Sequence, residues 1–310
     1  MGINGLNIWL RKNTRMGIKE INISDLSGKT IVIDISIYLY RFKSENNLID
    51  GIYEMLLLLN SNNIKPIVVF DGKPPEEKKE VIKDRQNTRI EAQEEYNKLL
   101  EKLELGDENI VDINNKIKKL KRQIVKINKN DIQCVKKLLN LMGITYYQSD
   151  GESDIVCANL VITGKAFACM SEDMDMFVYG CNRVLRYISL NKKTIILYNL
   201  PLILQSLNIS FKHFQIICIM SGTDYNKFNL VYSFNSSIKI YINYIRNKCN
   251  YDYLSWLFVK NYIDNKESIE NIINIFNSKN VSINKKNLCE SSENSDGLKL
   301  FLKDHGFIFA

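Results

Sequence analysis

The chain has 310 residues, of which 45% are hydrophobic, and it carries a formal net charge of +7. This length and composition suit a globular protein with one large or two modest domains, and no apolar run reaches the roughly 18–20 residues that a membrane-spanning helix needs. The positive charge is compatible with a polyanionic partner but does not by itself indicate one.

Cysteine and histidine usage excludes further classes of protein. The seven cysteines form no C-x-x-C pair, and His213 and His305 are the only histidines, so a zinc site is not expected. Most of the cysteines stand in apolar segments, which is typical of small buried side chains in a reducing compartment. The N-terminus lacks the apolar stretch and cleavage site of a signal peptide, so we expect an intracellular protein.

Two short β-branched runs near the N-terminus predict buried strands that end in a carboxylate. Thr30–Ser36 contains Asp34, and Lys65–Asp71 ends in Asp71. The apolar segment Ile52–Leu59 between them predicts a helix. A separation of about 30 residues fits a strand–helix–strand crossover, so the two strands are expected to be parallel.

The polar segment that follows predicts two antiparallel helices. Apolar residues recur at intervals of three and four in two runs, which are separated by Gly106-Asp107, as in the seam between packed helices. The first arm is acidic and the second basic, which is compatible either with charge compensation between the arms or with a basic wall facing a nucleic acid strand. The seams comprise Ala92, Tyr96, Leu99 and Leu103, and then Ile110, Ile113, Ile117, Leu120, Ile124 and Ile127.

A third apolar run, Lys165–Ser171, predicts another strand, and Asp173 and Asp175 follow it directly. Val184–Ser189 and Thr194–Tyr198 then predict a hairpin. In an open parallel sheet, ligands bind outside the carboxyl ends of the strands. One strand that ends in Asp usually marks only a turn or a helix cap, whereas three such ends indicate a shared site.

Two further acidic motifs join this set. Glu152 and Asp154 precede a predicted helix over Ile155–Val161, and two acids at this spacing can converge only in the first turn of that helix. Asp224 stands at a glycine turn after a predicted helix over Phe214–Met220. The candidate metal-binding carboxylates are therefore Asp34, Asp71, Glu152, Asp154, Asp173, Asp175 and Asp224.

Carboxylates that are brought together without cations raise one another's pKa. An all-oxygen ligand set favours Mg²⁺, or Mn²⁺ as its substitute, over Zn²⁺, and two such ions can activate water and stabilise the leaving oxygen in phosphodiester hydrolysis. Lys78 and Arg85 lie on a helix predicted to begin at Pro75. Such residues usually form only a solvated basic face, but beside carboxylates they can stabilise a scissile phosphate in its transition state.

Segments of the chain resemble, in order and spacing, the flap endonuclease family of 5′ nucleases over residues 1–225. They are Met1–Leu6, Val32–Asp34, Val69–Pro75, Leu141–Ile144, Gly151–Asp154, Ser171–Asp175 and Gly222–Tyr225. The resemblance implies an α/β fold with a PIN-like parallel-sheet nuclease core, an inserted helical arch and a helical C-terminal region. It also implies two Mg²⁺ ions and the hydrolysis of flapped or branched DNA in replication, repair or recombination.

By position, the resemblance implies roles for individual residues. Lys78, Arg85 and Asp175 would be catalytic, and Asp154 stands where the family usually has Glu. Nucleic acid would be contacted by Gly2 through the backbone, by Tyr40 through base stacking, and by the side chains of Lys78, Arg85, Arg89 and Lys239.

The chain departs from the family pattern after Asp224. Leu230–Phe234 replaces a Gly-x-Gly hairpin that grips duplex DNA through a potassium ion, so this clamp is expected to be absent or remodelled. A helix start at Ser236-Ser237, followed by Lys239, is expected to contact phosphates instead. Asn284–Ser295 is expected to be flexible, and Leu298–Ala310 carries no sliding-clamp-binding box.

These departures are reminiscent of proteins from large DNA viruses, so the expected location is the nucleus or, for a viral protein, a cytoplasmic replication site. We expect a monomer divided into residues 1–91 and 131–225 (nuclease core), 92–130 (arch) and 226–310 (helical DNA-binding region). A Holliday-junction resolvase or a 5′–3′ exonuclease on the same core remains an alternative. A non-catalytic PIN-like scaffold that binds nucleic acid is another, but it would be marked by lost carboxylates.

Removal of either acid after the third strand tests the metal site. We expect Asp173→Ala or Asp175→Ala to abolish cleavage while DNA binding persists, because each change removes a metal ligand together with a negative charge that faces phosphate. Substantial turnover by the double variant in Mg²⁺, measured on labelled flap DNA, would contradict a two-metal site.

Overall fold

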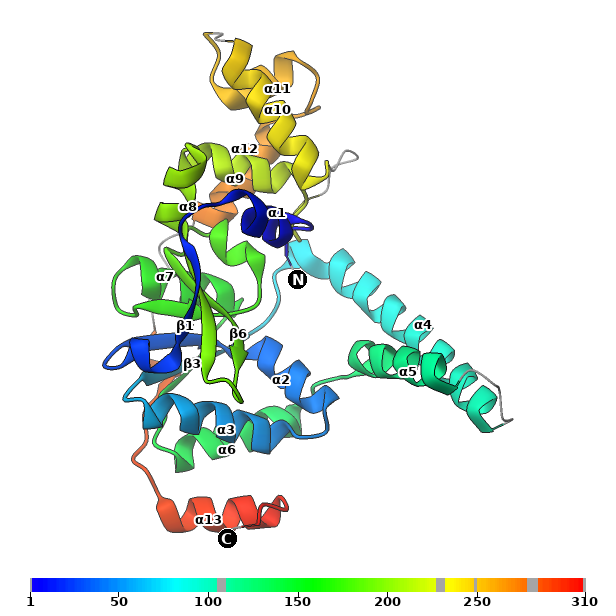
Figure 1. Ribbon diagram of the computed structural model, residues 1–310, viewed down its shortest axis with the longest axis vertical. Helices are drawn as coiled ribbons and strands as arrows, with labels where there is room; N and C mark the ends of the chain where they lie inside the picture. Colours follow the sequence, from blue (N-terminus) through cyan, green and yellow to red (C-terminus); the bar gives the residue numbers. More distant parts are fainter. Residues whose placement is uncertain (1, 105–109, 227–231, 248–249, 278–283, 309–310) are drawn as a thin grey trace.

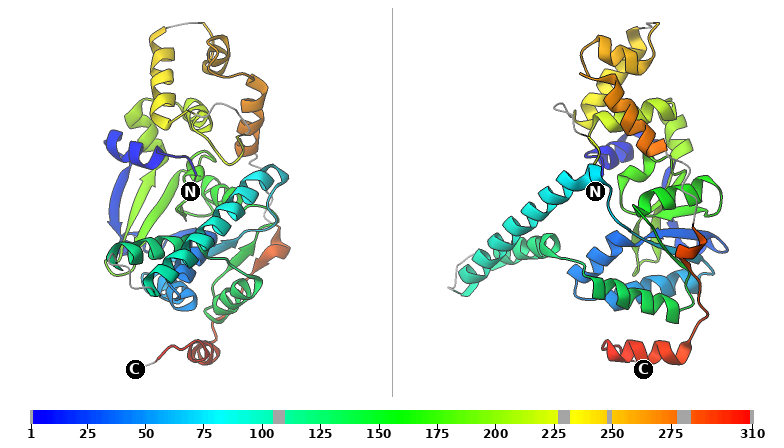
Figure 2. Two further views of the ribbon diagram at one scale, coloured as in Figure 1. Left: turned by 90° about the vertical axis from the view of Figure 1, so that its right-hand side faces the viewer. Right: turned by 180° about the vertical axis from the view of Figure 1, so that it is seen from behind.

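The structure, a computed structural model, describes residues 2–104, 110–226, 232–247, 250–277 and 284–308 (Figure 1). A central sheet carries helices on both faces, and an arm of two helices projects from one side (Figure 2). The strands cross the sheet in the order β1 (Ile18–Asn22), β7 (Thr194–Asn199), β6 (Arg183–Ser189), β5 (Ala168–Met170), β2 (Thr30–Asp34), β3 (Lys65–Phe70), β4 (Tyr146–Gln148) and β8 (Leu288–Cys289).

The inner strands of the sheet are parallel, as the sequence predicts for β2, β3 and β5. β2 pairs with β3 on one side and with β5 on the other, and β4 and β6 extend this parallel arrangement. The outer strands β1, β7 and β8 run antiparallel to their neighbours, and the predicted β6–β7 hairpin is confirmed. The carboxyl ends of β2, β3 and β5 therefore meet at one edge of the sheet.

Alternate residues of these strands point to opposite faces and build two hydrophobic cores. Val32 and Val69 belong to one core, whereas Ile31, Ile33 and Val68 belong to the other. The first core includes residues of α1 (Leu6–Asn13), α7 (Ser153–Ile162), α8 (Leu200–Leu207), α9 (Phe211–Met220), α10 (Phe234–Asn247), α11 (Tyr253–Val259) and α12 (Lys266–Asn277). The second includes residues of η1 (Ile23–Leu26), α2 (Ile35–Ser44), α3 (Leu48–Ser61), α6 (Lys129–Leu141) and α13 (Ser295–Asp304).

The projecting arm consists of α4 (Lys79–Glu104) and α5 (Ile110–Ile124), which confirms the predicted helical pair. Ala92, Ile113 and Ile117 of the predicted seams are buried where the two helices pack together. The expected turn at Gly106-Asp107 lies outside the described residues. α4 continues unbroken through residues 91 and 92, so the sequence-based boundary between core and arch falls inside a helix.

The prediction that Asn284–Ser295 is flexible is wrong, because this segment pairs with the edge of the sheet. It contains η4 (Lys285–Asn287) and β8, which pairs with β4. Further along, the Asn294 amide donates a hydrogen bond to the Leu141 carbonyl at 2.9 Å. Backbone groups make these contacts, so the polar side-chain composition of the segment does not reveal them.

Helix α10 begins at Phe234 rather than at the predicted Ser236-Ser237. Ser233 acts as its N-cap, because its hydroxyl accepts a hydrogen bond from the Ser236 amide at 3.2 Å. Ser237 is buried and accepts a hydrogen bond from the Ser221 hydroxyl at 2.9 Å. It therefore does not face a phosphate as expected. Of the segment 230–234, which is expected to replace the duplex clamp, residues 230 and 231 lie outside the described residues.

Across the described part of the chain, no single helix has both the length and the apolar character needed to cross a membrane. Helices α8 and α9 meet these criteria only when taken together, and they are bent by 90° relative to each other. Both helices contribute buried residues to the first core.

A glycine in α3 lets α2 and α3 pack closely, and α2 starts at the site described below. A Cβ built at Gly51 would overlap the ring of Phe42. We expect Gly51→Ala to lower the free energy of unfolding by about 1–3 kcal/mol through overpacking, although this change in a helix interior usually stabilises. Urea denaturation measures the effect, with Leu57→Ala on the exposed side of α3 as the control. Stabilisation by Gly51→Ala would contradict the packing described.

Candidate active site

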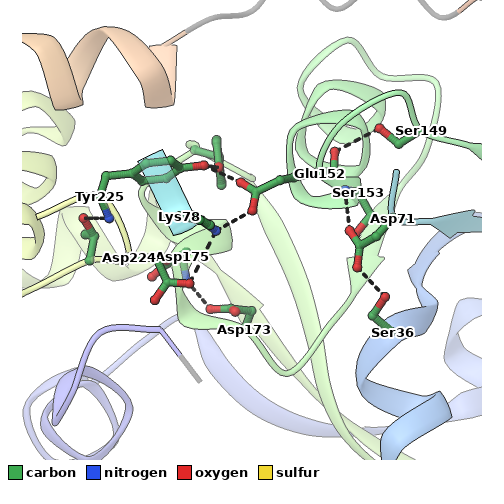
Figure 3. Close-up of polar contacts among 12 residues, drawn as sticks. Ser36, Asp71, Lys78, Ser149, Glu152, Ser153, Asp173, Asp175, Asp224 and Tyr225 are labelled. Atoms are coloured by element: carbon green, nitrogen blue, oxygen red, sulfur yellow. Dashed lines mark hydrogen bonds and ion pairs between the residues drawn. The ribbon is translucent and has the colours of Figure 1, made fainter. Parts of the chain in front are cut away.

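The seven predicted carboxylates lie at or near the edge of the sheet where the inner strands end. Asp34 ends β2 and is the N-cap of α2, with 3% of its surface exposed. Asp71 directly follows β3. Glu152 is the N-cap of α7 and Asp154 lies in its first turn, as the sequence predicts. Figure 3 labels Asp71, Glu152, Asp173, Asp175 and Asp224 around one site.

Ser153 links Asp34 with Asp71, and two further serine hydroxyls each hold one of these acids. Ser153 Oγ lies 3.1 Å from Asp34 Oδ1 and 2.7 Å from Asp71 Oδ1, and the Ser153 amide also donates to Asp71 Oδ1 at 2.8 Å. Ser171 Oγ donates to Asp34 Oδ2 at 2.9 Å, and Ser36 Oγ donates to Asp71 Oδ2 at 2.5 Å. The sequence analysis does not identify these hydroxyls as part of the site, because a local sequence pattern does not show in which direction a serine side chain points.

Asp173 and Asp175 are held at the start of η3 (Met174–Phe177). Asp173 is its N-cap and accepts a hydrogen bond from the Asp175 amide at 2.9 Å. Gly2 lies against both acids with φ at +73°, and a Cβ at this position would overlap Asp173 Oδ1. The chain can therefore approach these carboxylates so closely only with glycine at position 2.

Two cations from the base of the arm reach the other side of the cluster. Lys78 Nζ lies 2.5 Å from Glu152 Oε1 and 3.4 Å from Asp224 Oδ2, and the Arg85 guanidinium lies 2.8 Å from Asp224 Oδ2. Pro75 is the N-cap of η2 (Glu76–Lys78) rather than the first residue of a helix. Lys78 thus ends η2, and α4 begins at the next residue, which corrects the predicted single helix.

Tyr225 is a further member of the site that the sequence reasoning did not single out. Its hydroxyl donates a hydrogen bond to Glu152 Oε2, and its ring centroid lies 4.8 Å from Lys78 Nζ. It directly follows Asp224 and lies in the family-like segment Gly222–Tyr225, but neither signal reveals these contacts.

Burial and mutual repulsion raise the pKa of three of these acids. Burial, followed by the charge of Asp71, raises the pKa of Asp34 to about 7, although the hydrogen bond from Ser171 opposes the shift. Burial also raises the pKa of Asp154 and of Asp175 well above the usual range, with the next largest contribution from Asp34 for Asp154 and from Asp173 for Asp175. Burial opposes the charge of Lys78, but Glu152 and other nearby groups outweigh it and raise the pKa of this ammonium.

The ligand set fits a hard divalent cation. Among the described residues no three acidic, Cys or His side chains form a preassembled metal cluster, and Lys78, Arg85 and three serines contact several of the carboxylate oxygens. Asp175 Oδ1, however, is buried and has no hydrogen-bond partner. An unsatisfied buried carboxylate oxygen beside other raised-pKa acids is a site that a divalent ion would stabilise.

Three other predicted DNA contacts lie on helices α2, α4 and α10. Tyr40 is 40% exposed on α2, Lys239 is exposed on α10, and Arg89 lies one turn beyond Arg85 on α4. None of the contacts described above joins these three side chains to the cluster. Their roles stay predictions.

Comparisons with known proteins identify the family. The XPG N-terminal domain matches residues 1–92, and the XPG I-region matches residues 143–224. The chain is 33% identical to flap endonuclease 1 of Methanococcus aeolicus over 302 residues, which cover 92% of this chain and 86% of that relative. The chain belongs to the flap endonuclease family of structure-specific 5′ nucleases. It is also 35% identical to flap endonuclease 1 of Entamoeba histolytica, but the match covers 73% of this chain and only 62% of that relative.

Solved structures share the fold. The catalytic core of Rad2 in complex with DNA substrate superposes with a TM-score of 0.68 at 20% identity, covering 99% of this chain and 95% of that one. Flap endonuclease-1 from Methanococcus jannaschii gives a TM-score of 0.63 at 24% identity, with coverage of 94% and 91%. The predicted α/β nuclease fold and family are thus confirmed. Membership also implies, in general terms, a nuclease that depends on divalent metal.

The raised pKa of Asp34 predicts how stability depends on pH. The pKa is about 7 in the folded protein and 3.8 in an ordinary environment, so the metal-free protein loses stability as the pH rises through this interval. We expect Asp34→Asn to raise Tm at pH 8 by roughly 2–4 °C, the shift that about 1 kcal/mol produces, and the gain to shrink toward pH 5. Calorimetry in EDTA tests this, with exposed Asp84→Asn as the control; equal Tm values for wild type and Asp34→Asn would contradict it.

Proposed function

We propose that this chain hydrolyses DNA at 5′ flaps or branched junctions by a mechanism that uses two Mg²⁺ ions, with Mn²⁺ as a substitute. One observation carries the proposal: the seven carboxylates lie at or near one edge of the sheet, and two of them, Glu152 and Asp224, pair with Lys78 and Arg85 at the base of a projecting helical arm. Phosphodiester hydrolysis needs oxygen ligands for metal and positive charge for phosphate at one place.

The metal ligands in this proposal are Asp34, Asp71, Glu152, Asp154, Asp173, Asp175 and Asp224. Bound divalent ions would supply Lewis-acid chemistry that activates water and stabilises charge on the leaving oxygen. Support comes from the all-oxygen donor set, from the unpartnered Asp175 Oδ1 and from the raised pKa values of the buried acids. The unpartnered oxygen and the raised pKa values each indicate a free-energy cost in the metal-free protein that cations would offset.

The two cations have a distinct task. Lys78 is 8% exposed and is held by Glu152 and Asp224, so its ammonium points into the cluster. Arg85 shares Asp224 with it, but more than half of the Arg85 side chain is exposed. We assign to both the stabilisation of negative charge on the scissile phosphate. Arg85 can also contact DNA outside the cluster, because its exposed side chain remains accessible.

Flapped or branched DNA is the proposed partner. One of the structures that share this fold is described as the Rad2 catalytic core with DNA substrate, and the chain has a net charge of +7. Gly2, Tyr40, Arg89 and Lys239 are the further proposed DNA contacts. We also propose a monomer in a reducing intracellular compartment, which is compatible with the free thiols of the six cysteines in the described residues.

A substrate panel tests the proposed function. End-labelled flap, nicked, gapped and four-way DNA are incubated with Mg²⁺, and the cut positions are mapped on sequencing gels. We expect incision near the junction of the 5′ single strand with duplex, and none in EDTA. Preferred symmetrical cutting of the four-way substrate would instead favour a resolvase, and degradation from ends alone would favour an exonuclease.

Lys78→Ala tests the charge-stabilising role. We expect the single-turnover rate to fall by roughly 10²–10³, the scale for removing one donor that stabilises the transition state, while DNA affinity changes far less. Lys79→Ala is a matched control, because Lys79 is an exposed neighbour that pairs only with Glu76 among the ion pairs described. An unchanged rate with weakened binding would reduce Lys78 to part of a basic face.

A further inference from the structure

Tyr225 connects a predicted metal ligand with a predicted phosphate-stabilising cation. It is 5% exposed, its hydroxyl donates to Glu152 Oε2, and the Lys78 ammonium lies 4.8 Å from its ring centroid (Figure 3). A neutral hydroxyl donor thus holds one oxygen of Glu152, while Lys78 Nζ lies 2.5 Å from the other. The same tyrosine contacts both functional groups, one through its hydroxyl and one through its ring face.

The ring of Tyr225 is itself fixed by a second set of contacts. The hydroxyl of Tyr179, which is also 5% exposed, lies 3.2 Å from the Tyr225 hydroxyl. Phe276 of α12 packs edge-on against both tyrosines, with centroid separations of 4.7 Å to Tyr179 and 5.3 Å to Tyr225. Tyr179, which follows η3, and Phe276 of the C-terminal helical region therefore hold the Tyr225 side chain in place.

Glu152 needs such support because of where it lies. As the N-cap of α7 it makes no capping hydrogen bond with its side chain, so the helix does not fix the direction of its carboxylate. A free glutamate must lose rotamer freedom before it can bind a cation. A hydrogen bond from an outer partner removes part of that cost and fixes the orientation of the ligand.

We propose that Tyr225 is a positioning residue, which orients Glu152 toward a divalent cation and supports the Lys78 ammonium on its ring face. The proposal rests on the proposed function, from which Glu152 and Lys78 take their roles. A tyrosine that served only as packing would need neither the hydroxyl contact with Glu152 nor the placement of its ring beside Lys78.

Tyr225→Phe separates the two contacts, because it removes the hydroxyl and keeps the ring. We expect the affinity of the DNA-free protein for Mn²⁺, measured by calorimetry, to fall by roughly 10-fold or more, the effect of removing an outer partner of a metal ligand. Single-turnover cleavage at limiting Mg²⁺ should fall by a similar factor and recover in part at high Mg²⁺. DNA affinity in Ca²⁺ should stay unchanged.

Tyr147→Phe is the matched control. Tyr147 is 2% exposed on β4, and its hydroxyl accepts a hydrogen bond from the Asn284 amide at 3.3 Å, away from the carboxylates. Its removal should leave both the Mn²⁺ affinity and the Mg²⁺ requirement at wild-type values. Unchanged Mn²⁺ affinity in Tyr225→Phe would overturn the positioning role, even if its Tm fell, because a lower Tm alone would show only packing.

A double-mutant cycle identifies the group through which Tyr225 acts. In a Glu152→Gln background, Tyr225→Phe should weaken Mn²⁺ binding no further, whereas additive losses would overturn the assignment to Glu152. The two proposals fail separately. If the wild type cut no DNA in the substrate panel, the proposed nuclease function would fall; if it cut normally and Tyr225→Phe matched it in Mn²⁺ affinity, only the positioning role would fall.

Discussion

Repulsion among carboxylates is the constraint on which this structure depends. Parallel strands deliver Asp34 and Asp71 to one edge of the sheet, and the start of η3 brings Asp173 and Asp175 to the same place. Burial of Asp34, together with the charges of Asp71 and Asp173, raises the pKa of Asp34 to about 7. Neighbouring like charges destabilise one another unless partners compensate. Serine hydroxyls and cations from the arm provide this compensation in the metal-free protein, and a divalent cation would replace much of it.

The same constraint explains why distant segments converge on the site. Gly2 brings the N-terminal segment against Asp173, and η2 and α4 deliver Lys78 and Arg85. Phe276 of α12 supports the tyrosine that binds Glu152. The arm is thus joined to the carboxylates by ion pairs at its base. Because metal and phosphate would compete for these groups, binding at the site is expected to change how the base of the arm is held.

The periodicity of the apolar residues, and the position of acidic residues at the ends of apolar runs, are enough to predict much of this arrangement. Apolar runs that end in acid predicted β2, β3 and β5 and their parallel order, and three–four spacing predicted the paired helices of the arm. The short strand β8 and the N-cap of α10 were missed, because each depends on partners outside its own segment: β8 on the backbone of β4, and the α10 start on the Ser233 hydroxyl. Ser153 and Tyr225 lie within the family-like segments Gly151–Asp154 and Gly222–Tyr225. The sequence of these segments does not show where their hydroxyls point, because tertiary packing sets the direction of a hydroxyl.

Proton release on metal binding measures the central constraint most directly. Carboxylates must be deprotonated to bind Mg²⁺, and the pKa of Asp34 is about 7 in the metal-free protein. Calorimetric titration with Mg²⁺ at pH 6.5, in two buffers of different ionisation enthalpy, counts the protons released. We expect release of about one proton or more per protein, declining at pH 9 and reduced in Asp34→Asn. Mg²⁺ binding at pH 6.5 without proton release would show that the carboxylates are already ionised and would contradict the role given to their mutual repulsion.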